Sequence, residues 1–82
     1  MKWQHSDRSK ADYQNLQPVI RRAFDKQVRL LAANLNHPSL RAKKYDESHD
    51  LWQARITKGW RCFFKIAGDT YIIARIIPHP KK

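Results

Sequence analysis

The chain has 82 residues, 41% of them apolar, and carries a net charge of +10 at neutral pH from 17 Lys and Arg against 7 Asp and Glu. This length predicts one domain spanning residues 1–82, with a single small core and little stability to spare. So large a positive charge favours nucleic acid or an acidic protein as the binding partner.

The cysteine, histidine and hydropathy patterns exclude several classes of protein. Cys62 is the only cysteine, so an internal disulfide is excluded, and its place in an aromatic run indicates a buried apolar side chain. The four histidines show no metal-binding spacing, so we expect neither a metal site nor another cofactor. No signal peptide is recognisable and no apolar run is long enough to span a membrane. We therefore expect a cytoplasmic protein without a membrane partner.

The first half of the chain predicts a short strand and two helices. Residues 2–5 resemble an edge strand, and Ser6 or Asp7 can cap a first helix that runs to about Leu16. Pro18 suits the first turn of a second helix over residues 18–35. Five apolar residues of the second helix recur at spacings of three or four and predict a stripe that faces a core: Ile20, Phe24, Val28, Leu31 and Leu35.

The second half predicts a strand over residues 40–45, a polar loop over residues 46–50 and an antiparallel meander. The meander strands are residues 51–56, 60–66 and 70–79, which are rich in aromatic and β-branched residues and separated by short turns containing glycine. Helices that precede strands indicate an α+β fold. We expect two N-terminal helices packed on one face of a mostly antiparallel sheet of four to five strands, with the other face open.

Side chains alternate across each strand, and this alternation assigns them to the two faces. The predicted core face carries Trp52, Ala54, Ile56, Cys62, Phe64, Ile66, Ile72, Ala74 and Ile76. The predicted open face carries four cations and a histidine, namely Arg55, Arg61, Lys65, Arg75 and His79. Phe63 and Tyr71 would lie among these cations, where either ring could stack on a base. Three other rings are interpreted as core: Trp3, Tyr13 and Tyr45.

Four segments carry a resemblance that covers almost the whole chain. They are residues 37–44 (HPSLRAKK), 51–56 (LWQARI), 59–64 (GWRCFF) and 76–79 (IIPH). In order and spacing they resemble the RelE/ParE superfamily, the small toxins of bacterial and archaeal toxin–antitoxin pairs. The resemblance implies a RelE-like fold and a ribosome-dependent endoribonuclease that cleaves messenger RNA in the decoding site. It also implies an acidic cognate antitoxin that wraps the toxin, which we expect to be a monomer when free.

The resemblance also implies roles for individual residues. Against YoeB-like members, Arg61 matches the arginine that supports the scissile phosphate, His79 the near-terminal catalytic histidine, and Arg55 a basic residue on the preceding strand. Lys43 falls where YoeB-like toxins have a catalytic glutamate, and RelE-like members use lysines as base and electrostatic support. The further cations that we expect to bind RNA are Lys44, Lys65, Arg75, Lys81 and Lys82.

The expected reaction, cleavage of RNA without a metal, needs three groups. A base takes the proton of the 2′-hydroxyl, cations stabilise the charge on the phosphoryl oxygens, and an acid protonates the leaving 5′ oxygen. Guanidinium groups bind phosphate in a planar fork, which suits Arg55 and Arg61 to the second task. Histidine exchanges protons near neutral pH, which suits His79 to the third. Lys43 is the candidate base, provided that neighbouring cations promote its deprotonation.

Two other functions stay open. A ParE-like toxin inhibits DNA gyrase by protein contact, and such members typically lack the arginine and histidine pair that Arg61 and His79 supply here. A non-catalytic basic module would bind RNA or an acidic antitoxin. Pro80 keeps this alternative open, because many active members have a tyrosine near this end and none follows His79. Residue by residue, Arg55 could instead pair with a carboxylate of the 46–50 loop, and His79 could be an exposed tail residue.

Overall fold

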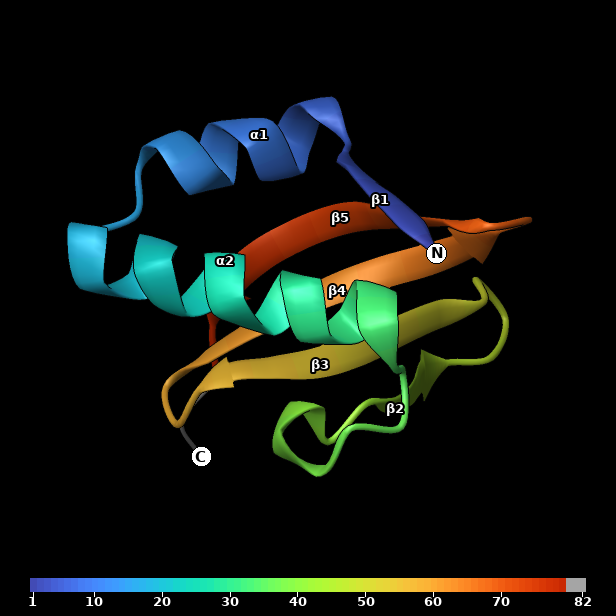
Figure 1. Cartoon of the computed structure of the whole chain (residues 1–82). Coiled ribbons are helices and arrows are strands. Elements are labelled where there is room, and N and C mark those ends of the chain that lie inside the picture. The colour runs from blue at the N-terminus through green and yellow to red at the C-terminus, as the bar shows by residue number, and fades with distance from the viewer. Residues whose placement is uncertain (80–82) are drawn as a thin grey trace.

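The computed structural model describes residues 1–79 and shows a five-stranded sheet with two helices on one side (Figure 1). The helices are α1 (Asp7–Gln14) and α2 (Pro18–Ala33), followed by a short 3-10 helix, η1 (Pro38–Leu40). The strands are β1 (Lys2–His5), β2 (Lys43–Asp46), β3 (Leu51–Thr57), β4 (Trp60–Ala67) and β5 (Thr70–Pro78). Their order in the sheet is β1-β5-β4-β3-β2, with β1 parallel to β5 and all other pairs antiparallel. The predicted α+β fold and the edge position of the first strand are confirmed.

The ends of the two helices follow from local sequence signals. The Ser6 hydroxyl caps α1 by accepting a hydrogen bond from the backbone N–H of Ser9 at 3.1 Å. Pro18 occupies the first position of α2, where its missing N–H costs nothing. The two helices run in opposite directions, and α2 crosses the sheet while α1 follows β5 (Figure 1). Within residues 1–79, no helix is long and apolar enough to cross a membrane.

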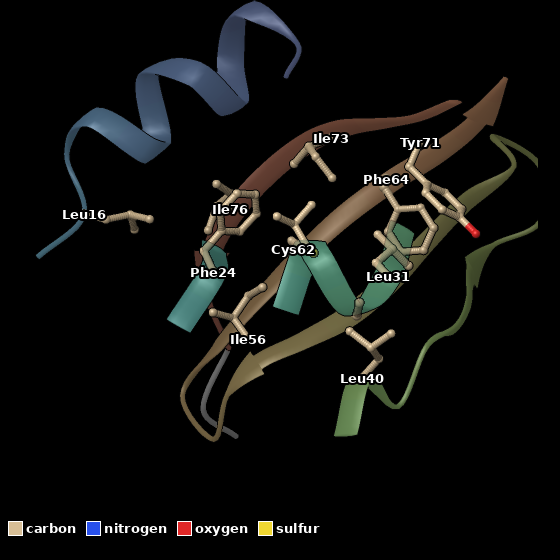
Figure 2. Packing of buried hydrophobic residues seen from close by; sticks show 12 residues of the cluster. Leu16, Phe24, Leu31, Leu40, Ile56, Cys62, Phe64, Tyr71, Ile73 and Ile76 are labelled. Carbon is tan, nitrogen blue, oxygen red and sulfur yellow. The ribbon is translucent and has the colours of Figure 1, made fainter. Parts of the chain in front are cut away.

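The hydrophobic core lies between α2 and the sheet (Figure 2). Phe24, Val28 and Leu31 of the predicted stripe are at most 2% exposed, and Ile20 and Leu35 pack against them half-buried. The inward side chains of β3 and β4 are those that alternation predicts, with Phe64 at 0% exposure at the centre of the sheet. Burial in this core raises the pKa of the Cys62 thiol to about 12, so the thiol is neutral at physiological pH and acts as an apolar side chain.

The predicted face of β5 is wrong over its first half, and a β-bulge is the reason. Phe63 pairs with Arg75 whereas Phe64 pairs with Ile73, so Ala74 is one extra residue on β5. An extra residue moves the side chains on one side of it to the opposite face of the sheet. The alternation counted back from Ile76 therefore fails from Ala74 towards the start of β5, and Ala74, which was expected in the core, lines a groove on the open face.

Two predicted ring positions are corrected by the structure. Because of the bulge, Tyr71 and Ile73 enter the core, at 3% and 0% exposure, in place of Ile72. Tyr71 is therefore not available to stack on a base. Tyr45 was expected in the core but is 60% exposed, because β2 is an edge strand. Its ring lies against that of Phe63 on the open face, with 4.9 Å between the centroids.

The segment before β2 also differs from the prediction, which placed a strand over residues 40–45. Pro38 starts the 3-10 turn, and the His37 ring nitrogen caps it by accepting a hydrogen bond from the backbone N–H of Ser39 at 3.2 Å. Arg41 then adopts a left-handed backbone with φ of 46°, an uncommon conformation for a residue other than glycine. The chain becomes extended only at Lys43.

Asp12 fastens α1 to the bulge in β5. Its carboxylate accepts hydrogen bonds from Nε of Arg75 at 2.8 Å and from the backbone N–H of Ile76 at 2.9 Å. The Ser6 hydroxyl donates to the carbonyl of Ala74 at 3.2 Å, so the groups that the bulge frees from the ladder find partners in α1. Burial by itself raises the pKa of Asp12, but the bonds from Arg75 and Ile76 outweigh it and hold that pKa below its ordinary value.

Substitution of the central core ring should measure the contact between α2 and the sheet. Phe24→Ala removes a side chain that is fully buried, and we expect the free energy of unfolding to fall by about 3–5 kcal/mol. Val19→Ala, at a position of the same helix that is 60% exposed, should change it by less than about 0.5 kcal/mol. Urea unfolding of the three proteins checks this, and equal midpoints for both variants would contradict the packing described.

The Asp12 contacts should give the fold an acid-sensitive component. A folded-state pKa below the unfolded one contributes stability at pH values above about 4, and this stability is lost as the pH falls through the folded-state pKa. Asp12→Asn should therefore cost about 2 kcal/mol at neutral pH, and the difference from the wild type should shrink below pH about 4. Unfolding free energies measured from pH 7 downward test this. A difference independent of pH, or one equal to that of the exposed Glu47→Gln control, would refute it.

Candidate active site

The four predicted catalytic residues line one hollow on the open face of the sheet, with a volume of about 210 Å³. Lys43 comes from β2, Arg55 from β3 and Arg61 from β4, and His79 follows β5. Arg41 and Gln53 complete the lining, and none of these six residues of the described chain is acidic. We call this the basic hollow.

Arg55 and Arg61 face each other directly across β3 and β4. Like charges at opposed positions of an antiparallel pair destabilise a sheet. The ladder is irregular next to this pair, where a bulge lies between Arg55 and Thr57, and bulges are common beside active sites because they re-aim side chains. Arg55 and Arg61 oppose each other although no acidic residue of the described chain lines the hollow to offset their repulsion. A local conflict of this kind is typical of a functional site.

Arg61 is held in place by the turn between β3 and β4. Its Nη1 atom donates to the carbonyl oxygens of Thr57 at 2.7 Å, Lys58 at 3.3 Å and Trp60 at 2.9 Å. Burial, then the charges of Arg55 and Arg41, lower the pKa of Arg61 from its ordinary value, and an arginine remains charged at neutral pH. Within residues 1–79 all hydrogen bonds of this guanidinium use Nη1, so Nη2 and Nε are available to a ligand.

Arg55 is positioned through its backbone by a buried amide. Nε2 of Gln27, a residue only 7% exposed on α2, donates to the carbonyl of Arg55 at 2.9 Å and to that of Ser39 at 3.2 Å. This amide joins α2, η1 and β3 at one point. Among the described residues, no ion pair joins Arg55 to Glu47 or Asp50, and Asp50 pairs with Lys44.

His79 is exposed, yet its backbone is fixed. Its N–H donates to the carbonyl of Gly59 at 2.8 Å, which extends the pairing of β5 with the start of β4 beyond Trp60 and Pro78. This bond holds the backbone of His79 next to the β3–β4 turn, and the residue lines the same hollow as Arg61.

Arg41 and Gln53 are the two members of the basic hollow that the sequence did not assign to the site. The left-handed backbone of Arg41 follows the 3-10 turn and brings its side chain to the same hollow as Arg55 and Arg61. The sequence signal was present in the His37-Pro38 start of the turn, but an expected strand over residues 40–45 concealed it. Gln53, the cross-strand partner of Lys43, was missed for another reason, since it carries no charge.

The cations predicted to bind RNA lie in different places. Lys65 is exposed on the open face. Lys44 is opposite Trp52, with its ammonium 5.1 Å from that ring, so it lies on the helix-bearing side of the sheet and not beside Lys65. Arg75 shares the side of Phe63, but its guanidinium bonds to Asp12. Lys81 and Lys82, like Pro80, lie outside the described residues.

An apolar groove occupies another part of the open face. It has a volume of about 210 Å³, and its lining is mostly apolar: Tyr45, Leu51, Phe63, Ala74, Arg75 and Ile77. β3, β4 and β5 each contribute to this apolar groove, and the same strands or their ends contribute to the basic hollow. The open face therefore offers a cationic site and an apolar site side by side.

The basic hollow has the chemistry expected for holding a phosphodiester. Two guanidiniums on adjacent strands can each donate in a planar fork to phosphate oxygens. A lysine and an imidazole reach the same space, and both residue types can transfer protons. With four cationic side chains and no acid in the lining, an anion is the ligand that relieves the mutual repulsion.

Comparison with known proteins gives no match at the level of sequence families and clear matches among solved structures. No model of a known protein family matches the chain, and no curated protein matches it. A YoeB/ParE toxin from Agrobacterium tumefaciens superposes with a TM-score of 0.81 at 16% identity, over 98% of this chain and 100% of that chain.

Two further structures show the same likeness. A chain of the archaeal RelE–RelB complex from Pyrococcus horikoshii OT3 superposes with a TM-score of 0.81 at 15% identity, over 99% of this chain and 97% of that chain. YafQ from E. coli strain BL21(DE3) superposes with a TM-score of 0.77 at 16% identity, over 95% and 92%. The chain accordingly has the fold of the RelE/YoeB-like toxin superfamily of type II toxin–antitoxin systems.

Proposed function

We propose that the protein is the toxin of a type II toxin–antitoxin pair and that it cleaves messenger RNA on the ribosome, in the cytoplasm. The observation that supports this most is the convergence of Lys43, Arg55, Arg61 and His79, from four separate segments, on one hollow without an acidic residue in its described lining. A fold of this kind could also serve a gyrase inhibitor or a non-catalytic binder. Neither of those functions requires a histidine in the same hollow as two opposed guanidiniums.

The proposed reaction is an attack of the 2′-hydroxyl on the adjacent phosphorus. Lys43 takes the proton of the hydroxyl, the 2′ oxygen forms a bond to phosphorus, and the bond from phosphorus to the 5′ oxygen breaks. Arg55 and Arg61 stabilise the charge that grows on the non-bridging oxygens. His79 donates a proton to the departing 5′ oxygen. The products are a 2′,3′-cyclic phosphate and a free 5′-hydroxyl, and no cofactor takes part in this scheme.

We also propose that an acidic antitoxin covers the open face. Solved structures with this fold include the RelB–RelE complex from Methanococcus jannaschii and the YoeB–YefM complex from Staphylococcus aureus. An antitoxin segment that brings carboxylates to the basic hollow and apolar side chains to the apolar groove would match both parts of the face. The charge of +10 would speed the encounter.

Removal of the Arg61 guanidinium should abolish most of the cleavage. Arg61→Ala should lower the rate of messenger-RNA cleavage on ribosomes about a hundredfold, which corresponds to about 3 kcal/mol of transition-state stabilisation. The three bonds to the turn carbonyls add a stability cost of about 1 kcal/mol, so melting temperatures must accompany the rates. Lys10→Ala removes an exposed charge from α1 that does not line the basic hollow and should leave the rate nearly unchanged.

Growth arrest on expression and mapping of cleaved messenger-RNA ends give the readout for these variants. Wild-type cleavage by a folded Arg61→Ala protein would end the proposed mechanism. A wild-type protein that cleaves nothing would favour the non-catalytic alternative. The leading explanation would then be Pro80 and the missing tyrosine after His79.

The apolar groove should contribute to the affinity for the antitoxin. Tyr45→Ala removes a ring that is 60% exposed on the open face, and we expect it to weaken the complex about tenfold, as for a moderate interface hot spot. Val19 is exposed to the same extent on α2, and Val19→Ala should have little effect. Calorimetric titration with the product of an adjacent acidic reading frame tests this. Equal affinities for the two variants would place the antitoxin elsewhere.

A further inference from the structure

A second hollow lies beside the basic hollow and is larger, with a volume of about 500 Å³. Its walls are α2, the segment around η1, β3 and the turn that follows β3. Four cations line it without an acid among its described lining residues: Lys26, Arg41, Arg55 and Lys58. The hydroxyls of Ser39 and Thr57 add hydrogen-bonding groups. Neither the expected reaction nor the expected antitoxin contact uses this second hollow.

The two hollows are adjacent and share two lining residues. Arg41 and Arg55 line both of them, so a ligand that occupies one lies next to the other. The Gln27 amide on α2 fixes the backbone where the two hollows meet, because it donates to the carbonyls of both Arg55 and Ser39. The left-handed backbone of Arg41 places a third guanidinium between the hollows. Glycine adopts this backbone conformation at lower cost than arginine, so a turn with only a structural role would favour glycine here.

We propose that the second hollow binds a backbone phosphate of the same single-stranded RNA whose scissile phosphate occupies the basic hollow. Besides the apolar Ala23, Pro38 and Ile56, its described lining contains cations, hydroxyls and an amide but no aromatic ring, which suits the phosphate and ribose of a nucleotide rather than stacking of its base. Phosphates recur along an RNA strand, so two phosphates of one strand can occupy the two hollows. Arg41 and Arg55, which line both hollows, would then lie between these two phosphates. This inference rests on the proposed function in taking RNA as the ligand.

Lys26 and Lys58 allow the second hollow to be tested independently of the catalytic residues. Both are exposed and both line the second hollow but not the basic hollow. The double variant Lys26→Ala/Lys58→Ala therefore leaves the proposed catalytic residues untouched. The double variant Lys2→Ala/Lys10→Ala is the matched control, since it removes two exposed lysines from β1 and α1 and gives the same net charge.

The test is binding of a labelled single-stranded RNA of about eight nucleotides with 2′-O-methyl riboses, which 2′-hydroxyl attack cannot cleave. Fluorescence anisotropy at several salt concentrations gives affinity and salt dependence. The Lys26→Ala/Lys58→Ala protein should bind about tenfold more weakly, and the slope of log affinity against log salt should flatten by about 0.7 for each lost phosphate contact. The Lys2→Ala/Lys10→Ala protein should resemble the wild type.

Equal effects of the two double variants would overturn the inference, because the loss would then reflect net charge alone. Retained RNA affinity together with weakened binding of polyglutamate would also overturn it and would identify an acidic protein chain as the ligand. Binding and cleavage are measured separately, so the two proposals can fail separately. A protein that binds RNA through Lys26 and Lys58 but cleaves none supports this site and contradicts the nuclease.

Discussion

Phe24 lies at the centre of the contact between α2 and the sheet, and the burial of one sheet face beneath α2 is the constraint on which the site depends. A sheet that packs on one side only must place alternate side chains in solvent. β3 and β4 use these outward positions for Arg55 and Arg61, while Ala54 and Cys62 face the core. The cations can be concentrated because the apolar contacts on the other face supply the stability.

Hydrogen bonds to neighbouring segments hold the crowded residues of the basic hollow in place. Arg61 is bonded to turn carbonyls, and Arg55 is anchored through its backbone by Gln27. His79 is fixed by its backbone bond to Gly59. These contacts keep like charges together in the absence of a ligand, a strain that a bound phosphate would relieve. Rigid placement of this kind lowers the reorganisation needed when charge develops in a transition state.

The sequence was sufficient for the fold and for the convergence of the site, and it failed where the backbone departs from regular geometry. The stripe of α2 and the alternation of β3 and β4 predicted the core, because both elements are regular. The bulge at Ala74 has no local sequence signal, so the inward face of β5 was misassigned at Tyr71 and Ile73. The left-handed turn at Arg41 was missed because a strand was expected over residues 40–45. The face of the sheet on which Lys44 lies was not predicted, because a short edge strand gives too few residues to fix its register.

The chemical identity of the RNA ends produced on ribosomes distinguishes the proposed reaction from other modes of cleavage. Attack by the 2′-hydroxyl, with Lys43, Arg55, Arg61 and His79 in the roles given above, leaves a 2′,3′-cyclic phosphate or its hydrolysis product and a 5′-hydroxyl. Ligation-based mapping, with and without prior treatment by polynucleotide kinase, identifies these ends. We expect 5′ ends that accept a phosphate from the kinase. Fragments that carry a 5′-phosphate and a 3′-hydroxyl would exclude attack by the 2′-hydroxyl.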